Sequence, residues 1–546
     1  MLKLGFIENI KEHALQVVQR SPVYDWFLSQ QECARFVVDL SDNWPGDSGR
    51  GRWFCNNALD CKGALWQAQD SLWDEDIPFE KHAEHLQSFD WLRDLKALGG
   101  DMGRLKARDS VRSWIERHPK YNRFAWRSDL LGARITNWIK LYSFFGASAD
   151  DHFQDLFFNS LNKQFKHLGA CLPENYYSFE HLHALIGYIY GGIALQSQET
   201  KLEKGLSLLD EALPKLILSD GGFVTRSPQD LVEALKIILD LKTALKSANY
   251  PLPAAIEHAL DRGIPALRFF RHNDNKLALF QNTQEGNEAS LGLVITRGGV
   301  RGKTWNSLPV TGYERLNLGK AVAILDTGKA PHSADTRGLH ASPLAFEFSY
   351  GKDRIFSNCG AHPTDKNWQY ALRSTPAHTA LTVDHRNAFE IKENNYIGRM
   401  ALETKVHRED IKQGTLVSAS HDGYYTVNGL IHHRSLFLDQ TGDDLRGEDT
   451  LTQTIETEYS HDFAIRFHLH PTVKASLVNN GTEVLVKTRT GIGWRFFTKG
   501  AILTVEDSIY LGDGCNPRKT QQIVLTGRTK SNVKETTVKW ALQREG

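Results

Sequence analysis

The hydrophobic period changes once along this chain, near residue 272, and no other feature constrains the fold as strongly. Before that point apolar residues recur every three or four positions, as Leu131, Ile135 and Trp138 do, which predicts helices that bury one face. After it, short runs alternate apolar and polar residues between Gly, Asn and Asp turns, which predicts antiparallel strands. We therefore expect a multidomain α+β protein, with an all-α half over residues 1–272 and an antiparallel β-sandwich over residues 273–546.

The composition is that of a globular protein, and its charge balance limits which kinds of partner are expected. Lys plus Arg equals Asp plus Glu at 65 each, so no overall positive field favours nucleic acid. The six cysteines lack the CxxC spacing of a zinc ribbon. The N-terminus carries charges where a signal peptide needs an unbroken apolar stretch, and no run of about 18 apolar residues follows. We expect no membrane span and a cytoplasmic location, with a periplasmic one as the alternative.

One predicted helix start is dense in groups that exchange protons. The stretch NYYSFEHLHALIGYIYGG, residues 175–192, places Tyr176 and Tyr177 in the turn before the helix and Glu180, His181 and His183 at its start. Tyrosine and histidine can act as general acids and bases when their surroundings tune the pKa. The alternative is that these are solvated residues of a first helical turn.

A second helix start has a capping pattern, with an arginine just before it. In SDGGFVTRSPQDLVEAL, residues 219–235, Ser227 is a predicted N-cap, Pro228 is the first helical residue and Asp230 the third. Arg226 precedes the cap. If it points into a cleft, its guanidinium suits a carboxylate or a sulfate; the alternative is a surface arginine.

Residues 336–362 predict a β-hairpin with a histidine at its entrance. Phe346 and Phe348 alternate with Glu347 as in a half-buried strand, and the chain turns back at 351–353. The second strand leads to Asn358, so His340 and Asn358 are expected near one end of the same sheet. Such a pair could contribute to a site.

Two further segments of the β half carry histidines. In RSTPAHTALTVD, His378 stands at the entrance of a predicted strand and Arg373 lies five residues before it, with a turn histidine bonded to backbone as the alternative. In AIRFHLHP, His468 and His470 alternate with apolar residues on a predicted polar outer face; an HxH pair can bind zinc, but no third ligand is identifiable.

The chain has no P-loop, dinucleotide fingerprint, HExxH or GxSxG motif. Paired carboxylates for glycoside hydrolysis stay open, since two acids can come together from anywhere in a chain.

The order of the halves and several motifs together resemble the heparinase II/III-like superfamily of polysaccharide lyases. The motifs are the Tyr/His-rich helix start, DGGFVTRSP, GLHASPLAFEF followed by NCG, and RSTPAHTALTVD. Stretches such as WPGDSGRGRWF, PALRFFRH and HDGYYTVNGLIHHRSL resemble a bacterial branch of that superfamily. The resemblance covers nearly the whole chain and implies an (α/α) toroid followed by a β-sandwich. It also implies β-elimination on a uronic-acid polysaccharide, in which a base removes the C5 proton while a neutralising group faces the carboxylate.

Several matched positions depart from the superfamily's pattern. His181 is kept, but Glu180 stands where the neutralising asparagine is expected, and the tyrosine expected after DGG falls at Gln229 or Asp230. The resemblance implies zinc in the β half, bound by an HxH pair and an acid. Here Gly338 replaces the first histidine, His340 is kept, and Asn358 replaces the acid, so the zinc site is weakened. His378 matches the histidine of the Ala-His segment.

Three interpretations of the function follow. In the first, a carbon–oxygen lyase uses His181 as the leading proton-transfer residue, with Tyr177 or Tyr176 replacing the missing tyrosine, His378 assisting, and Glu180, Arg226 or Arg373 contacting an acidic polysaccharide or oligosaccharide. In the second, the scaffold binds such a glycan without cleaving it. In the third and least favoured, Glu180 and another acid hydrolyse it. The sequence leaves activity, polymer and oligomeric state open.

Overall fold

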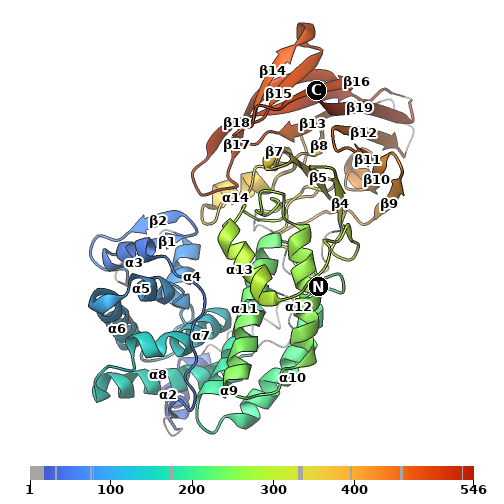
Figure 1. Ribbon diagram of the computed structural model, residues 1–546. Coiled ribbons are helices and arrows are strands. Elements are labelled where there is room, and N and C mark those ends of the chain that lie inside the picture. The colour runs from blue at the N-terminus through green and yellow to red at the C-terminus, as the bar shows by residue number, and fades with distance from the viewer. Residues whose placement is uncertain are drawn as a thin grey trace. The chain divides into compact units, whose positions relative to one another are not determined.

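The structure is a computed structural model that describes residues 17–30, 34–73, 77, 79–172, 178–329, 336–393, 396–454, 459–531 and 533–545 (Figure 1). The chain forms two compact units, of which unit 1 holds residues 1–216 and 236–257 and unit 2 holds residues 217–235 and 258–546. These units differ from the expected ranges 1–272 and 273–546, because residues 217–235 and 258–272, which include helical segments, group with the β-rich part. The domain boundary at residue 272 stays a prediction.

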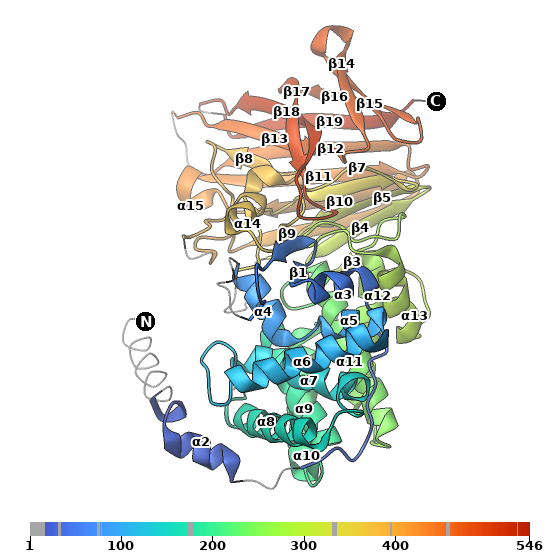
Figure 2. The ribbon, with the colours of Figure 1, turned by 90° about the vertical axis from the view of Figure 1, so that its left-hand side faces the viewer.

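The described residues of unit 1 are mainly helical and include one short hairpin, and Figure 2 shows the helices in blue to green. Its elements are α2 (Pro22–Ser29), α3 (Ser48–Cys55), β1 (Ala58–Cys61), β2 (Ala64–Gln67), α4 (Glu80–Ser88), α5 (Leu92–Leu98), α6 (Gly100–Arg117), α7 (Ser128–Phe145), α8 (Asp151–Ala170), α9 (Phe179–Ala194) and α10 (Glu199–Leu216). Helices α11 (Pro228–Ser247) and α12 (Ala254–Phe269) contribute to both units. Among the described residues, no helix is both long and apolar enough to cross a membrane.

Glycines allow the central helices of unit 1 to approach closely. A Cβ atom on Gly187 of α9 would lie 2.4 Å from the Cα atom of Gly132 of α7, so only glycine fits there. Helix α9 also continues to Ala194 past Gly191 and Gly192. A Cβ atom on Gly191 would lie 2.3 Å from the Phe165 ring, so this glycine serves helix packing and not termination.

Two helix predictions are confirmed. The stripe containing Leu131 and Trp138 lies in α7, which begins at Ser128 and ends at a Gly146 C-cap. The capping pattern at the start of α11 is confirmed, because the Asp230 N–H donates to Ser227 Oγ at 3.3 Å.

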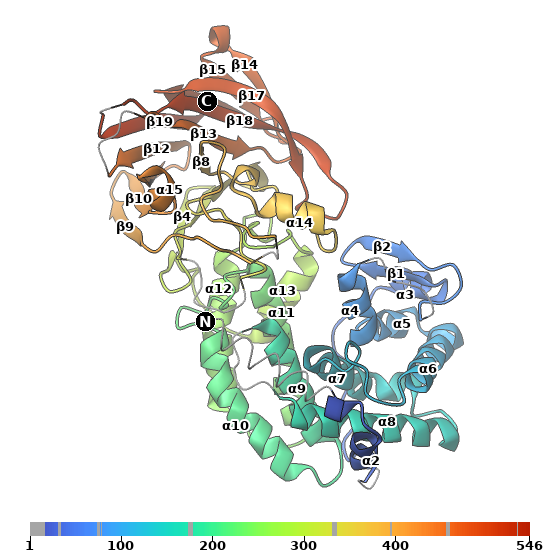
Figure 3. The ribbon, with the colours of Figure 1, turned by 180° about the vertical axis from the view of Figure 1, so that it is seen from behind.

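Unit 2 contains three antiparallel sheets (Figure 3). The first has the order β3 (Ser307–Leu308), β4 (Tyr313–Leu318), β5 (Ala321–Asp326), β6 (Phe346–Tyr350), β7 (Asp353–Phe356). The second has the order β17 (Ile502–Tyr510), β18 (Arg518–Arg528), β13 (Asp462–His468), β8 (Leu381–Val383). The third has the order β14 (Lys474–Val478), β15 (Glu483–Lys487), β16 (Gly493–Lys499), β19 (Glu535–Arg544), β12 (Asp444–Gln453), β11 (Leu430–Asp439), β10 (Gly414–His421), β9 (Thr404–Ile411). Besides its parts of α11 and α12, the described residues of unit 2 also form the helices α13 (Glu288–Gly298), α14 (Lys366–Arg373) and α15 (Tyr425–Asn428) and two short 3-10 turns.

One aromatic core joins the three sheets. Trp540 of β19 stacks on Phe346 of β6 with ring centroids 5.6 Å apart and meets Phe467 of β13 at 4.8 Å. These strands come from different sheets, so the sheets close on a common apolar interior.

Two strand predictions in this half were wrong. Residues 288–298 fall in the half predicted to form antiparallel strands, but they form helix α13, because the Asn287 side chain caps its start and Leu291 and Val294 face inward at helical spacing. Strand β6 is buried on both faces and not half-buried, because its polar residues find buried partners: Glu347 bonds His272 at 3.0 Å and Ser349 bonds the same ring at 2.8 Å.

Candidate functional site

His340 and His378 lie together in the interior of unit 2, in a directed chain of hydrogen bonds. The backbone N–H of Asn282 donates to His340 Nε2 at 2.8 Å. His340 Nδ1 lies 2.9 Å from His378 Nε2, and His378 Nδ1 lies 2.8 Å from the Ser374 carbonyl oxygen. Because a carbonyl oxygen only accepts, His378 carries its proton on Nδ1, and His340 donates to it from its own Nδ1. All four ring nitrogens are therefore occupied.

Both rings of this histidine pair are held neutral. His340 is 2% exposed and His378 is 1% exposed. Burial lowers the pKa of His340 well below its ordinary value, with a further decrease from His378, and burial lowers the pKa of His378 to about 4. The pair therefore holds its protons in fixed places at neutral pH.

The residues near this pair do not fit the zinc ion that the resemblance implied. Zinc binds imidazole through a free lone pair, but the Nε2 lone pair of His340 is taken by the Asn282 N–H. The Asn358 amide is also engaged, accepting from the Thr379 N–H at 3.1 Å and donating to the Leu279 carbonyl at 3.2 Å. Across the described residues, no group of three or more His, Cys, Asp or Glu side chains could hold a metal ion.

Arg226 is buried and paired, which excludes the surface arginine considered above. Its guanidinium forms an ion pair with Asp326, and its Nε donates to the Thr311 carbonyl at 2.7 Å. Burial alone would lower the pKa of Arg226, but the Asp326 carboxylate raises it. A Cβ atom on Gly328 would lie 2.2 Å from Arg226 Nη2, so glycine is needed there. The Arg226 guanidinium, which was expected to contact a uronate, therefore stabilises the interior of unit 2.

Arg373 is likewise turned inward. It is 3% exposed, and its Nε and Nη2 donate to the carbonyls of Leu339 and Thr336 at 2.9 and 3.2 Å. Arg373 therefore holds the loop that carries His340.

Several residues around Asp326 and His340 have a left-handed backbone conformation. Gln281 bonds both residues, donating to Asp326 Oδ2 at 3.0 Å and accepting from the His340 N–H at 2.8 Å. The non-glycine residues with positive φ here are Arg226, Gln281, Asn282 and Leu344, at 63°, 47°, 61° and 58°. Each such residue costs roughly 1–3 kcal/mol and persists only where its surroundings enforce it. The region is therefore a rigid structural centre.

The helix start in unit 1 has a different character. The Ser178 side chain caps α9 by accepting from the His181 N–H at 3.3 Å, as the sequence pattern allows. Glu180, His181 and His183 are half-buried, and Nδ1 of His181 is buried without a hydrogen-bond partner among the described residues. Tyr176 and Tyr177 lie outside the described residues.

A row of charges lies on the elements next to this helix start. Glu84 accepts from Lys81 at 2.7 Å and from Arg127 at 2.6 Å, and Arg127 also holds Asp129 at 2.7 Å. Burial alone would lower the pKa of Lys81, but the Glu84 carboxylate raises this pKa above its ordinary value. Glu180 adds a smaller increase. These positive groups already have carboxylate partners.

His468 does not lie on a solvent face. It is 4% exposed, its Nε2 donates to the Pro376 carbonyl at 2.8 Å, and its Nδ1 meets Ser508 Oγ at 2.8 Å. His470 lies 3.3 Å from the Glu285 carboxylate. The alternation of the strand was correct, but neighbouring elements cover its second face.

Sequence reasoning missed a second buried histidine pair. His421 Nε2 lies 3.2 Å from His432 Nδ1, and His432 Nε2 lies 2.8 Å from Asp449, which also accepts from Arg434 Nε at 2.7 Å and Trp540 Nε1 at 2.9 Å. The signal was available, because His432 and Arg434 share a strand face with the buried leucines of β11.

A helical array followed by an antiparallel sandwich is also the architecture of solved polysaccharide lyases. Heparinase III superposes with a TM-score of 0.73 at 15% identity, covering 94% of this chain and 86% of its own. A mutant of heparan sulfate lyase HepC from Pedobacter heparinus gives 0.63 at 15% identity over 92% and 84%. Chondroitin AC lyase from Streptomyces coelicolor A3 gives 0.54 at 11% over 97% and 80%. At these identities the likeness shows the fold, and it confirms the predicted toroid and sandwich.

Sequence comparison gives the family. Residues 300–541 match the model described as heparinase II/III-like, C-terminal. FtsZ-localized protein C from Caulobacter vibrioides is 30% identical over 522 residues, which cover 92% of this chain and 89% of that protein. The chain belongs to the heparinase II/III-like superfamily.

Proposed function

We propose that this protein binds an acidic polysaccharide or oligosaccharide on a lyase scaffold without cleaving it. The observation that carries the proposal is the closed hydrogen-bond chain through His340 and His378. A proton-transfer residue needs a nitrogen that can reach substrate, whereas both rings are buried and fully bonded.

Other features support binding without elimination. The guanidinium of Arg226 is committed to Asp326, so it cannot neutralise a uronate carboxylate without leaving that aspartate buried and unpaired. Glu180 stands where the resemblance implies a neutralising amide, and a carboxylate there would repel a uronate. The lyase fold is retained, while the groups expected to neutralise the uronate carboxylate are replaced or already engaged.

Affinity electrophoresis combined with a product assay tests the proposal. We expect the full-length protein to migrate more slowly through a gel containing heparan sulfate or chondroitin sulfate than through one containing uncharged dextran. Incubation with the same polymers should give no ultraviolet absorbance from unsaturated uronate ends. Equal migration in all gels would refute binding.

An increase in absorbance would show that the protein is a lyase. If the His181→Ala variant then gave no increase, His181 would be the catalytic base. New reducing ends without absorbance would indicate hydrolysis.

A second candidate function rests on the full-length similarity to FtsZ-localized protein C. We propose that this chain also associates with FtsZ at the division site. Co-sedimentation with FtsZ polymers tests this directly: the protein should pellet with FtsZ and GTP and stay in the supernatant with GDP. Pelleting to the same extent in both samples would contradict the proposal.

A further inference from the structure

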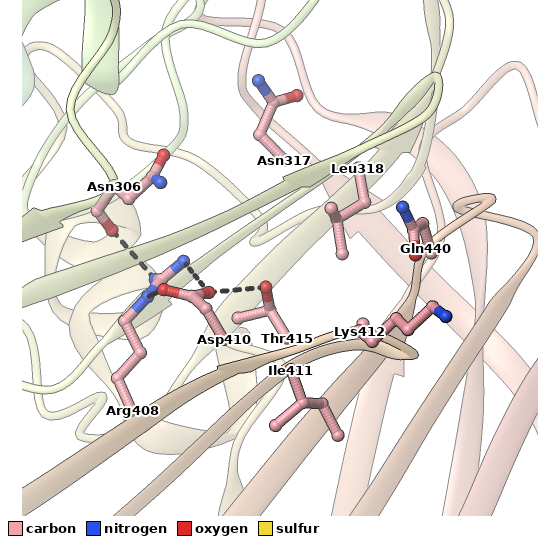
Figure 4. Close-up of a pocket in the computed structure, with 10 residues that line it drawn as sticks. Asn306, Asn317, Leu318, Arg408, Asp410, Ile411, Lys412, Thr415 and Gln440 are labelled. Atoms are coloured by element: carbon pink, nitrogen blue, oxygen red, sulfur yellow. Dashed lines mark hydrogen bonds and ion pairs between the residues drawn. The ribbon is translucent and has the colours of Figure 1, made fainter.

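Arg408 of β9 is an arginine whose charge is already balanced by carboxylates. In a pocket of unit 2, it holds Asp410 with two bonds of 3.0 Å (Figure 4), and it also donates to Glu314 at 3.0 Å. Asp410 accepts from Thr415 as well, at 2.7 Å. With two carboxylates around it, this guanidinium has no unpaired charge to offer an anionic ligand.

Helix α6 of unit 1 carries three arginines in a different setting. Arg104, Arg108 and Arg112 are spaced four residues apart, so they follow one face of the helix. Arg104 has a carboxylate partner, Asp101, at 2.6 Å. Arg108 and Arg112 have no carboxylate partner among the described residues. Because like charges one turn apart repel each other, this face of α6 lacks negative charge.

Two of these guanidiniums converge on one hydroxyl group. Ser148, in the turn between α7 and α8, accepts from Arg104 Nη1 at 2.9 Å and from Arg108 Nη2 at 2.8 Å. Both lone pairs of the Ser148 Oγ atom are therefore used, and its O–H is left as a hydrogen-bond donor. Ser148 is exposed, so a ligand from solvent can reach it.

The protein also holds the two unpaired arginines in place. Arg108 Nε donates to the Phe145 carbonyl at 2.9 Å. The guanidiniums of Arg108 and Arg112 lie 6.0 and 5.6 Å from the centre of the buried Phe153 ring. Arg108 Nη1 and all three guanidinium nitrogens of Arg112 have no hydrogen-bond partner in the part of the chain that the structure describes. Two positioned cations therefore keep donors free for a ligand.

Repulsion between these arginines is reflected in the pKa of Arg108. Burial lowers this pKa, and the neighbouring Arg104 guanidinium lowers it further. Arg112 adds a smaller decrease, while the Asp150 carboxylate acts in the opposite direction. Asp150 is already engaged as the N-cap of α8, where it accepts from the Phe153 N–H at 2.7 Å. An anion beside Arg108 would therefore relieve repulsion that the protein's own carboxylates leave in place.

We propose that Arg108, Arg112 and Ser148 bind a tetrahedral oxyanion with two negative charges, namely phosphate or the phosphoryl group of a phosphate monoester. Two unpaired guanidiniums match the charge of a dianion, whereas a single carboxylate would balance only one of them. Their planar forks can each bond two oxygens, and the Ser148 O–H supplies a further donor.

This site is separate from the helix start that carries His181, so it goes beyond the proposed glycan binding. Gly132, near the start of α7, packs against α9 so closely that a Cβ atom on it would lie 2.2 Å from the His183 carbonyl oxygen. Ser148 follows the other end of α7. Because α7 has 18 residues and an α-helix rises 1.5 Å per residue, the two ends lie roughly 27 Å apart.

Isothermal titration calorimetry of the full-length protein with inorganic phosphate and with glycerol 3-phosphate, in excess sodium chloride, tests the proposal. We expect both compounds to bind and to weaken as salt is added. Tighter binding of glycerol 3-phosphate would assign the site to a monoester, and the reverse order would assign it to free phosphate.

Variants at Arg112 connect the binding to this face of α6. Arg112→Gln should weaken binding about tenfold, as expected for loss of one charge-assisted hydrogen bond. Arg112→Lys should weaken it less, because it keeps the charge and loses only the fork. Arg386→Gln, at an exposed arginine of unit 2, is the matched control and should change nothing.

No heat of binding from either compound, or an affinity that Arg112→Gln leaves unchanged, would overturn the site. Circular dichroism and the melting temperature of each variant check its fold. Arg112 forms no hydrogen bond or ion pair among the described residues, so we expect Arg112→Gln to fold as the wild type does.

Discussion

The start of helix α9 in unit 1 and the histidine pair of unit 2 carry the same kinds of side chain in opposite settings. His181 is half-buried and its Nδ1 has no partner among the described residues, whereas His340 is buried and bonded at both nitrogens. A retained histidine can exchange protons with a ligand only if its neighbours leave a ring nitrogen free and accessible. In this protein the histidine nitrogen without a described partner is buried at the start of α9, whereas the histidine pair of the β-rich unit is bonded at every ring nitrogen.

Loss of the carboxylate that holds the second buried histidine pair should have a large effect on stability. Asp449→Ala leaves Arg434 and His432 buried without their carboxylate, so the free energy of unfolding should fall by roughly 3–5 kcal/mol. Urea denaturation followed by tryptophan fluorescence measures it. Asp507→Ala, at an exposed pair with Lys519, should cost less than about 1 kcal/mol. Equal decreases in the free energy of unfolding for the two variants would show that burial does not determine the contribution of these ion pairs to stability.

The pH dependence of stability distinguishes a neutral buried histidine from an available one. The pKa of His378 is about 4 in the fold and about 6.5 when unfolded, so below pH 6.5 the unfolded chain binds the proton more readily. His378 should therefore reduce the free energy of unfolding by about 3 kcal/mol as pH falls from 6.5 to 4. His378→Gln should lose that part of the slope in denaturation curves measured at each pH. An unchanged slope would argue against a neutral His378.

Alanine substitutions compare the two settings directly. His340→Ala removes the partner of the Asn282 N–H and of His378, and should destabilise by roughly 1–3 kcal/mol. His181→Ala should stay within about 0.5 kcal/mol, because its ring makes no described hydrogen bond. Thermal and chemical unfolding of both variants give the comparison. A reversed order would contradict it.

Zinc should have the smallest effect. Because the ring nitrogens of the histidine pair are occupied, we expect zinc at micromolar concentration to leave the melting temperature of the wild-type protein unchanged. A rise in melting temperature that His340→Ala abolishes would place a metal at this pair after all.

Local patterns predicted much of the fold. The helical stripe of α7 and the capping residues Ser227 and Asp230 depend on spacing within one segment, and both are found as expected. Helix α13 was missed because the Asn287 cap outweighed a β-branched run that resembles a strand.

The environment of the site residues could not be predicted from local patterns. His340 takes its partners from residues 282 and 378, and Arg226 takes its partner from residue 326, across separations that no local pattern encodes. The sequence identified which residues to examine, whereas long-range packing decided which of them are available.

An elimination assay on the wild-type protein decides whether it binds acidic glycans without cleaving them. Heparan sulfate and chondroitin sulfate are incubated at length with the full chain while the ultraviolet absorbance of unsaturated uronate is recorded. Binding without elimination predicts a flat trace from polymers that the protein retains in affinity gels. A rising trace that depends on the protein and is lost in His181→Ala would contradict binding without elimination and make this chain a lyase.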